Sequence, residues 1–391
     1  MRIGVVGAGT MGAGIAQVAL EAGDDVAMYD VAPGAVDGAR GRIADGLGRR
    51  AAKLGMTGAK AEDWKAIRLD RLRAVASLGA VADADLVIEA AVEDLALKRV
   101  VFATLDREAA ATTILATNTS ALPVAEIAAD AADRSRIVGL HFFNPAPVMP
   151  LVEVVVGVET DPDTAARAEA VITRWGKTPI RCADSSGFVV NRINRPFTLE
   201  ALRLLEGGSA TIEEIDAAIR AEGFPQGPFE HIDLIGLDVN LATSRAVHAG
   251  LGSPDRLAPS ALQERLVAAR RLGRKRGVGF YEYDADGHLV RPGPGFGRRG
   301  GKHVALPPAA IADRVRLALA NEAFHAIGDQ VATADRIDVA LRLGAAHPQG
   351  PVEWATSRGL DRVDAELSAL AVAEGARYAP APALREAAAG A

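Results

Sequence analysis

The sequence is poor in cysteine and lacks long hydrophobic runs, and each of these shortages excludes certain kinds of protein. Cys182 is the single cysteine among 391 residues, which excludes an internal disulfide and a multi-cysteine metal site and fits a reducing compartment. The first apolar run, residues 3–6, is too short for a signal peptide or a membrane-spanning helix. We therefore predict a cytoplasmic protein that holds no metal and has no membrane partner.

The charge balance argues against a further class of partners. The 44 basic and 50 acidic side chains give a net charge of −6 at pH 7, and they form no long block of one sign. A surface that binds nucleic acid needs clustered positive charge. We expect no nucleic-acid partner, and any anion that binds must be held by a local arrangement of side chains and backbone.

A glycine motif near the start of the chain predicts a dinucleotide site. A short apolar strand over residues 1–6 leads into Gly7, Gly9, Thr10, Met11 and Gly12, and an Ala-rich helical segment follows over 13–22. In that context the first glycine permits a tight turn, the second lets the backbone approach a pyrophosphate, and the third lets the helix pack closely on the strand. The backbone N–H groups at the helix start then bind the anion.

The next strand predicts which dinucleotide is bound. Residues 26–29 form a second apolar run that ends in Asp30, eighteen residues after Gly12. A carboxylate at this place accepts a hydrogen bond from the ribose 2′-hydroxyl and repels a 2′-phosphate, which favours NAD over NADP. The alternative interpretation is a glycine-rich turn without a ligand.

A long basic segment follows where a return to the sheet is expected. Residues 33–73 have a mostly helical pattern, so we predict a helical arm. Its basic residues are Arg40, Arg42, Arg49, Arg50, Lys53 and Lys60. They either grip phosphate groups or form an ordinary solvated helix face.

Polar residues follow the next apolar runs. Residues 86–90 and 113–116 are predicted buried strands, and the second is followed by Asn118, Thr119 and Ser120. In doubly wound folds, ligand-contacting groups lie at the carboxyl ends of the strands. The Ser120 hydroxyl can bond to a substrate oxygen or cap the next helix, and the two roles are compatible.

A histidine and a glutamate stand in two neighbouring predicted strands. Residues 137–143 and 151–156 are rich in β-branched residues, with prolines between them. His141 ends the first run and Glu153 lies inside the second. Because an unpaired buried carboxylate is costly, we expect Glu153 to pair with His141, which would make the imidazole a stronger base with a fixed tautomer. The alternative is a core histidine bonded to a loop.

The second half of the chain has a helical pattern. A strand over 178–183 precedes the change, and residues 188–206 then show helical spacing with Pro196 predicting a bend and Asn191 in the first turn. Residues 211–214 form a capping box that opens the next helix. A stiff connector over 224–230 precedes an apolar helix predicted to begin near Asp233.

The helical segment occurs twice. Residues 313–316 and 321–323 align with 191–194 and 199–201 at a separation of 122 positions, and 347–353 align with 224–230 at 123. We therefore predict copies over 185–283 and 309–391, joined by a Gly- and Pro-rich linker over 284–308. Asp313 takes the place of Asn191 in the second copy.

In order and spacing, these motifs together resemble the L-3-hydroxyacyl-CoA dehydrogenase family. The matching segments are residues 7–17, Asp30, 93–98, 118–122, 141–145 and 151–155. The resemblance implies an α/β Rossmann-type NAD-binding domain over 1–184, whose arm at 33–73 contacts CoA, followed by the all-α C-terminal domain in two tandem copies. It also implies NAD-dependent oxidation of an acyl-CoA 3-hydroxyl, a reaction of fatty acid β-oxidation.

The resemblance assigns catalytic roles by position. His141 corresponds to the catalytic base and Glu153 to the carboxylate that orients it. Ser120 corresponds to a residue near both the substrate hydroxyl and the nicotinamide, and Asn191 to a substrate-side asparagine.

The resemblance also assigns binding residues. Cofactor contacts are implied for Glu93, Lys98, Asn144 and Lys275. Lys53 falls on a CoA contact of the arm. Gly46 stands where relatives can have a serine, so one CoA contact is missing or moved.

Two rival functions stay open on the sequence. The first is an NAD-dependent dehydrogenase of a non-CoA hydroxy acid such as a sugar acid, and the second is a non-catalytic NAD-binding structural protein. Phe142, Phe143 and the basic arm favour an acyl-CoA substrate, with a short chain such as 3-hydroxybutyryl-CoA preferred. The assembly is expected to be a homodimer, or a monomer in which the two helical copies form a pseudo-dimer.

Overall fold

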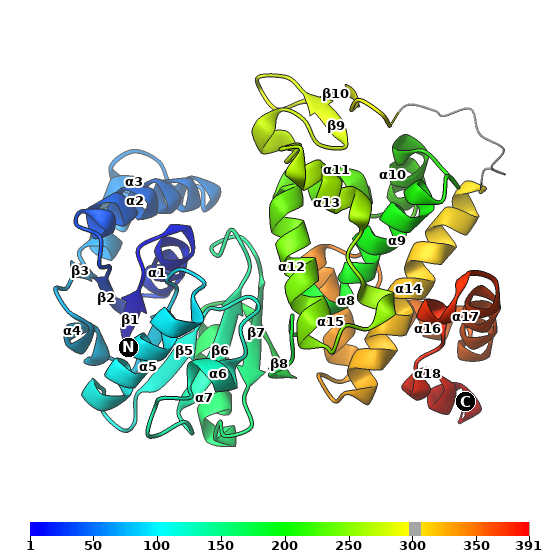
Figure 1. Ribbon diagram of the computed structural model, residues 1–391. Helices are drawn as coiled ribbons and strands as arrows, with labels where there is room; N and C mark the ends of the chain where they lie inside the picture. The colour runs from blue at the N-terminus through cyan, green and yellow to red at the C-terminus, as the bar shows by residue number, and fades with distance from the viewer. Residues whose placement is uncertain (297–305, 391) are drawn as a thin grey trace. The chain divides into compact units, whose positions relative to one another are not determined.

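The chain folds into two compact units, Met1–Asp184 and Ser185–Ala391, shown in the computed structural model of Figure 1. The structure describes residues 1–296 and 306–390. The first unit is an α/β domain and the second is almost entirely helical. This order agrees with the predicted Rossmann-type domain followed by a helical domain.

An eight-stranded sheet in the order β3-β2-β1-β4-β5-β6-β7-β8 forms the centre of the first unit. The strands are β1 (Arg2–Val6), β2 (Asp25–Tyr29), β3 (Leu72–Ala74), β4 (Leu86–Glu89), β5 (Ile114–Thr117), β6 (Ile137–Phe142), β7 (Leu151–Val156) and β8 (Thr178–Ala183). The first six are parallel, whereas β7 runs antiparallel to β6 and parallel to β8. The start of β7 therefore meets the carboxyl end of β6.

Helices complete the first unit. They are α1 (Thr10–Glu21), α2 (Ala35–Lys53), α3 (Gly58–Leu69), α4 (Leu78–Ala82), α5 (Leu95–Glu108), α6 (Val124–Ile127) and α7 (Pro162–Arg174). The predicted arm is the hairpin of α2 and α3, which lie side by side, with α2 against α1 (Figure 1). The sequence prediction of one arm over 33–73 was too long, because β3 begins at Leu72. A strand of three residues is too short to show a periodicity.

In the second unit, α14 shares a hydrophobic core with helices that come earlier in the chain. Its helices are α8 (Val190–Ile193), α9 (Arg195–Glu206), α10 (Ile212–Ala221), α11 (Pro228–Ile235), α12 (Leu237–Gly250), α13 (Ala261–Ala268), α14 (Pro308–Gly328), α15 (Ala334–Ala345), α16 (Pro351–Arg358), α17 (Leu360–Glu374) and α18 (Pro382–Ala389), with short 3₁₀ turns η1 (Asp255–Leu257), η2 (Arg274–Arg276) and η3 (Ala376–Tyr378). Phe197 and Phe229 pack in the same core as Ile311 and Val315 of α14.

Local sequence signals are partly confirmed here. The helical run over 188–206 breaks at Asn194, two residues before Pro196, and the Thr211 capping box forms with Glu214. The expectation of a helix beginning near Asp233 was wrong. Helix α11 begins at Pro228, whose fixed φ suits the first turn of a helix.

The first part of the segment predicted as a linker has regular structure. Strand β10 (Leu289–Pro292) pairs antiparallel with β9 (Tyr281–Tyr283), so the first part of 284–308 is a hairpin. Helix α14 begins at Pro308, just before the predicted start of the second copy. Residues 297–305 of that prediction lie outside the described residues.

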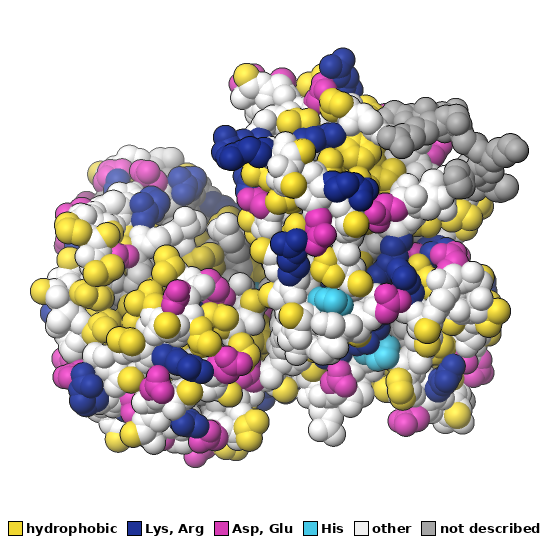
Figure 2. All heavy atoms as spheres, viewed as in Figure 1, with side chains coloured by type: hydrophobic (Ala, Val, Ile, Leu, Met, Phe, Trp, Pro, Cys, Tyr) yellow, Lys and Arg dark blue, Asp and Glu magenta, His cyan; other side chains and the backbone are white. Residues whose placement is uncertain are grey.

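Basic and acidic side chains are interspersed over both units on the face shown in Figure 2. Among residues 1–296 and 306–390, no helix is both long enough and apolar enough to cross a membrane.

Candidate active site

His141 and Glu153 meet at the junction of β6 and β7. They are direct partners in the antiparallel ladder, and the His141 Nδ1 atom lies 2.5 Å from the Glu153 Oε2 atom. Both side chains are buried. A carboxylate held at one imidazole nitrogen fixes the tautomer and stabilises the protonated ring. The predicted pairing is confirmed, and the reversed direction of β7 brings Glu153 to the carboxyl end of β6.

The end of β6 and the loop after it are held by two side chains, Asn118 and Lys177, and the sequence analysis predicted this positioning role for neither. Asn118, which follows β5, accepts a hydrogen bond from the Phe142 backbone at 2.8 Å. The Lys177 ammonium donates to the carbonyl oxygens of Ala146 and Met149 in the loop between β6 and β7. Burial lowers the pKa of Lys177 to about 8. These contacts position the strand end that carries His141 and the loop that carries Asn144.

Ser120 is held beside Glu93. The Glu93 carboxylate accepts hydrogen bonds from the Thr119 hydroxyl at 2.6 Å and from the Ser120 backbone at 2.9 Å. Burial raises the pKa of Glu93, but these hydrogen bonds and the nearby charge of Lys98 outweigh it and lower the pKa below its usual value. Glu93 thus stays ionised and orders the turn that carries Ser120.

Lys98 belongs to a buried network that the sequence analysis missed. Its ammonium donates to both carboxylate oxygens of Glu89 at 2.7 and 2.8 Å and lies 3.3 Å from Glu93. Glu89 also accepts from the Thr117 hydroxyl. A glutamate that ends the apolar run of β4 was the available signal, because a buried carboxylate needs partners. The network fixes the carboxyl ends of β4 and β5.

The glycine motif has the space that a dinucleotide needs. Gly7 has φ of +101°, and a Cβ there would lie 2.5 Å from the Ala90 carbonyl oxygen. A Cβ on Gly12 would lie 1.9 Å from the Gly7 carbonyl oxygen, whereas a Cβ on Gly9 would meet nothing within 4 Å. The turn and the close packing of α1 thus require Gly7 and Gly12, and the open space at Gly9 fits a pyrophosphate above the first turn that holds Thr10 and Met11.

Asp30 lies at the end of β2, beside the glycine turn. Its carboxylate accepts hydrogen bonds from the backbone N–H groups of Ala8 at 2.7 Å and Ala32 at 2.9 Å. Arg42 of α2 donates to the Ala8 carbonyl oxygen. The carboxylate expected to select NAD is therefore held next to the turn.

Two residues of the arm bear on the expected CoA contacts, Lys53 and Gly46. Lys53 is exposed at the last position of α2. Gly46 faces α1, where an added Cβ would lie 2.0 Å from the Gln17 side-chain oxygen. A serine at position 46 would require Gln17 to move, so close packing of the two helices accounts for the glycine.

Two predicted site residues, Asn191 and Lys275, lie in the second unit, and so does Asp313, the counterpart of Asn191 in the proposed second copy. Asn191 is in α8, half-buried. Lys275 is exposed in η2, where its ammonium lies 2.6 Å from Asp238. Asp313, the counterpart of Asn191, forms an ion pair with Arg358 in α16 at 2.8 Å.

Family models match nearly the whole chain. The model of the "3-hydroxyacyl-CoA dehydrogenase, NAD binding domain" matches residues 2–185. The model of the "3-hydroxyacyl-CoA dehydrogenase, C-terminal domain" matches residues 187–283 and again 311–390.

Similar proteins extend over most of the same length. A 3-hydroxyadipyl-CoA dehydrogenase of Escherichia coli is 36% identical, covering 98% of this chain and 96% of its own length. A 3-hydroxybutyryl-CoA dehydrogenase of Mycobacterium tuberculosis is 42% identical over 72% of this chain and 98% of its own. A crystal structure of 3-hydroxybutyryl-CoA dehydrogenase from Escherichia coli superposes with a TM-score of 0.90 at 33% identity, covering 100% of this chain and 98% of that one.

Proposed function

The chain belongs to the 3-hydroxyacyl-CoA dehydrogenase family and is an NAD-dependent oxidoreductase, and from that premise we propose that it oxidises a short-chain (S)-3-hydroxyacyl-CoA, such as 3-hydroxybutyryl-CoA, to the 3-ketoacyl-CoA. The buried pair of His141 and Glu153 carries this proposal. An imidazole with a carboxylate on Nδ1 is suited to remove a proton from an alcohol through Nε2.

In the proposed mechanism, His141 accepts the proton of the 3-hydroxyl group as the alcohol is oxidised. Glu153 stabilises the imidazolium that forms and keeps the ring in its productive orientation. Bound NAD supplies the acceptor for the two electrons and the hydrogen that leave the carbon atom. Ser120 and Asn191 donate hydrogen bonds to the reacting oxygen and position it toward His141.

The proposed cofactor contacts follow the carboxyl edge of the sheet. The pyrophosphate is held by Gly7, Gly9, Gly12 and the N–H groups of Thr10 and Met11, and the ribose by Asp30. Further contacts are proposed for Glu93, Lys98, Ser120, Asn144 and Lys275. The roles proposed for Glu93 and Lys98 include ordering the Ser120 turn, which their hydrogen bonds and ion pair support.

CoA is proposed as the carrier of the acyl group, with Lys53 on the arm contacting it. The test follows absorbance at 340 nm with NADH and acetoacetyl-CoA, using NADPH and free acetoacetate as controls. Rapid loss of NADH with the CoA ester alone supports the proposal. Turnover of free hydroxy or keto acids without CoA would instead favour the sugar-acid alternative, and NADH binding without any turnover would favour a structural protein.

We further propose that the second unit contains two tandem copies of one helical domain, related by a pseudo-two-fold axis. The observation that supports this proposal is a reciprocal pair of ion pairs, in each of which the glutamate is buried. Arg192 donates to Glu322 at 2.8 Å, and Arg314 donates to Glu200 at 2.9 Å. Arg192 and Arg314 are separated by 122 positions, as are Glu200 and Glu322. Such exchange of partners is what an isologous dimer interface shows.

Equivalent residues also meet near the proposed axis. Phe224 and His347, which are 123 positions apart, have ring centroids 5.0 Å from each other. His347 bonds to Asn194 at 2.9 Å, and Arg316, the counterpart of Asn194, lies 5.6 Å from the Phe224 ring. A pairing of residue i with j, repeated as j with i, supports two-fold symmetry.

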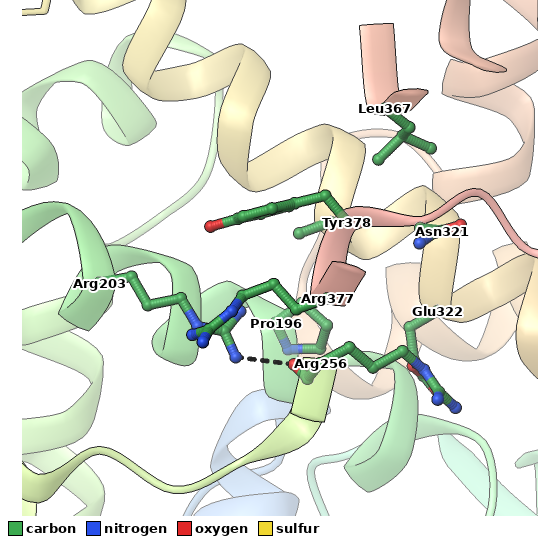
Figure 3. A pocket seen from close by; sticks show the side chains of 9 residues that line it. Pro196, Arg203, Arg256, Asn321, Glu322, Leu367, Arg377 and Tyr378 are labelled. Atoms are coloured by element: carbon green, nitrogen blue, oxygen red, sulfur yellow. Dashed lines mark hydrogen bonds and ion pairs between the residues drawn. The ribbon is translucent and has the colours of Figure 1, made fainter. Parts of the chain in front are cut away.

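A small pocket separates the proposed copies at another point. The residues labelled in Figure 3 that line it come from both proposed copies, with Pro196, Arg203 and Arg256 from the first and Glu322, Arg377 and Tyr378 among those from the second. Arg256 donates to Glu322, and the Tyr378 hydroxyl donates to Glu200. Both glutamates therefore accept hydrogen bonds from the opposite copy.

The proposed pseudo-dimer predicts the boundaries of the helical domains and the oligomeric state. We propose a first copy over 185–283, a second over 309–391 with Asp313 in place of Asn191, and a connecting segment over 284–308. If the interface is satisfied within one chain, light scattering on the pure protein will give a monomer mass. A dimer built through the first copy alone would contradict the proposal.

We also propose that the protein is cytoplasmic, which cell fractionation tests.

A further inference from the structure

Arg195 is a buried cation four residues after Asn191, beyond the break at Asn194. It is the first residue of α9, and only 5% of its surface is exposed. Its Nε atom donates to the Asn191 carbonyl oxygen at 2.7 Å, and its Nη1 atom lies 3.5 Å from the Ser244 hydroxyl of α12. The Ser244 hydroxyl itself donates to the Asn240 carbonyl oxygen. These neutral contacts orient the guanidinium without neutralising it.

Several other buried or half-buried arginines of the same unit have carboxylate partners, whereas the half-buried Arg271 bonds to the carbonyl oxygens of Pro294 and Gly279. Arg192 pairs with Glu322, Arg314 with Glu200 and Glu374, and Arg358 with Asp313 and Glu366. Within residues 1–296 and 306–390, no carboxylate forms an ion pair with Arg195. A buried charge without a counter-ion is costly. A bound anion would offset this free-energy cost by supplying the missing counter-ion.

The positive charge of this region comes from Arg195 itself. Burial lowers the pKa of Arg195 to about 10, so the guanidinium remains charged at neutral pH. Burial, together with the charge of Arg195, lowers the pKa of His231 to about 4, so that neighbouring ring is neutral. A carboxylate entering this region would meet a permanent positive charge and donors with fixed orientation.

We propose that Arg195 determines substrate specificity by binding a carboxylate at the far end of the acyl chain, so that the preferred substrate is the CoA monoester of a dicarboxylic acid. This inference rests on the proposed function and on Asn191 as a substrate-side residue. Asn191 lies in α8 and Arg195 begins α9, on either side of the break at Asn194. The hydrogen bond from the Arg195 Nε atom to the Asn191 carbonyl oxygen holds the guanidinium beside the backbone of the proposed substrate-side residue. In this proposal the terminal carboxylate lies a few carbon atoms beyond the 3-hydroxyl carbon.

The test compares two substrates of equal chain length. 3-Oxoadipyl-CoA ends in a carboxylate, and 3-oxohexanoyl-CoA ends in a methyl group at the same position. The quantity measured is the ratio of their kcat/KM values with NADH. We expect the wild-type protein to favour the carboxylate by at least about tenfold, because a site built for a charged group rejects an analogue that lacks it.

Three variants test whether the Arg195 guanidinium causes that preference for the carboxylate. Arg195→Met removes the charge while keeping side-chain length, and we expect the ratio to fall to one or below. Arg195→Lys keeps the charge but not the fork, and we expect a ratio between those two. Arg203→Met, on the same helix but paired with Glu200, is the matched control and should keep the wild-type ratio.

The outcomes separate failure of this inference from failure of the proposed function. A wild-type ratio near one, with good turnover of acetoacetyl-CoA, would overturn the inference and leave the proposed function standing. A preference that survives in Arg195→Met would overturn the role of Arg195, since a purely structural arginine does not affect the ratio. No turnover with any CoA ester would overturn both.

Arg195→Met could prevent folding, so a second measurement does not depend on it. Adipyl-CoA and hexanoyl-CoA are compared as competitive inhibitors of the wild-type enzyme with acetoacetyl-CoA as substrate. Tighter inhibition by adipyl-CoA, by about tenfold, supports the inference. Equal inhibition by the two esters would contradict it.

Discussion

The His141 Nδ1 atom lies 2.5 Å from the Glu153 Oε2 atom, on two antiparallel strands that place the two residues directly opposite each other. Each strand supplies one of the two residues, so the pair forms only when β6 and β7 lie side by side. Because β7 reverses the direction of the sheet, a residue near the start of β7 reaches the carboxyl end of β6. The proposed base and the carboxylate that orients it are therefore fixed by backbone hydrogen bonds.

Replacing the base tests the proposed mechanism. We expect His141→Ala to lower kcat by a factor of about 10² to 10⁴, the usual contribution of general base catalysis. Steady-state assays at 340 nm measure the loss, and a fluorescence titration with NADH should show unchanged cofactor binding. A variant with near-native kcat would show that His141 is not the base.

Removing only the charge of Glu153 tests the orienting role. Glu153→Gln keeps the size of the side chain but cannot balance the imidazolium, so we expect kcat to fall by about 10²-fold or more. Glu159→Gln, an exposed carboxylate of the same unit that pairs with Arg134, is the control. If both variants kept the wild-type kcat, Glu153 would have only a structural role.

Cofactor choice is expected to depend on Asp30. In Asp30→Ser, the carboxylate that repels a 2′-phosphate is absent, so the ratio of kcat/KM for NADPH to that for NADH should rise by about tenfold or more. Asp25→Ser changes an exposed residue that pairs with Arg71 at the start of β2, the strand that leads to Asp30, and is the matched control. An unchanged ratio in Asp30→Ser would place the selectivity elsewhere.

The reciprocal ion pairs of the second unit predict a large stability effect. Glu322→Gln leaves the buried Arg192 without its buried partner, which should lower the free energy of unfolding by about 3 kcal/mol, or roughly 6–12 °C in Tm. Glu264→Gln breaks the exposed pair with Arg245 and should change stability by less than about 1 kcal/mol. Calorimetry measures both. Equal effects would mean that the buried pair contributes no more than a surface pair.

His347 should make the second unit less stable in acid. Burial, with the positive charge of Arg316 and the nearby His231, lowers the pKa of His347 to about 3. The unfolded chain binds this proton below about pH 6.5, so unfolding takes up a proton and stability falls as the pH drops from 6.5 toward 3.

The change His347→Gln isolates that proton. The raised pKa values of Asp216 and Asp233 act in the opposite direction over part of this range, so the difference between wild type and variant is the quantity of interest. We expect the dependence of unfolding free energy on pH between 4 and 6 to become shallower by up to about 1.4 kcal/mol per pH unit. Parallel pH profiles for the two proteins would exclude the assignment.

Local features were predictable from the sequence because they depend on near neighbours. The glycine turn of residues 7–12, the Thr211 capping box and the break near Pro196 each follow from conformational limits or hydrogen bonds within a few residues. The strands around His141 and Glu153 followed from β-branched runs and intervening prolines. The short strand β3 and the hairpin of β9 and β10 were missed, because three or four residues carry too weak a pattern.

The sequence by itself determined the order of the domains, the dinucleotide motif and the residues available for proton transfer. Only the tertiary structure decided that Lys98 is buried against Glu89, that Arg192 and Arg314 exchange partners with Glu322 and Glu200, and that Arg195 is buried without a carboxylate partner among the described residues. The physical reason is the distance along the chain. Periodicity and capping act within one or two turns, whereas the partner of a buried charge depends on which helices and strands pack together.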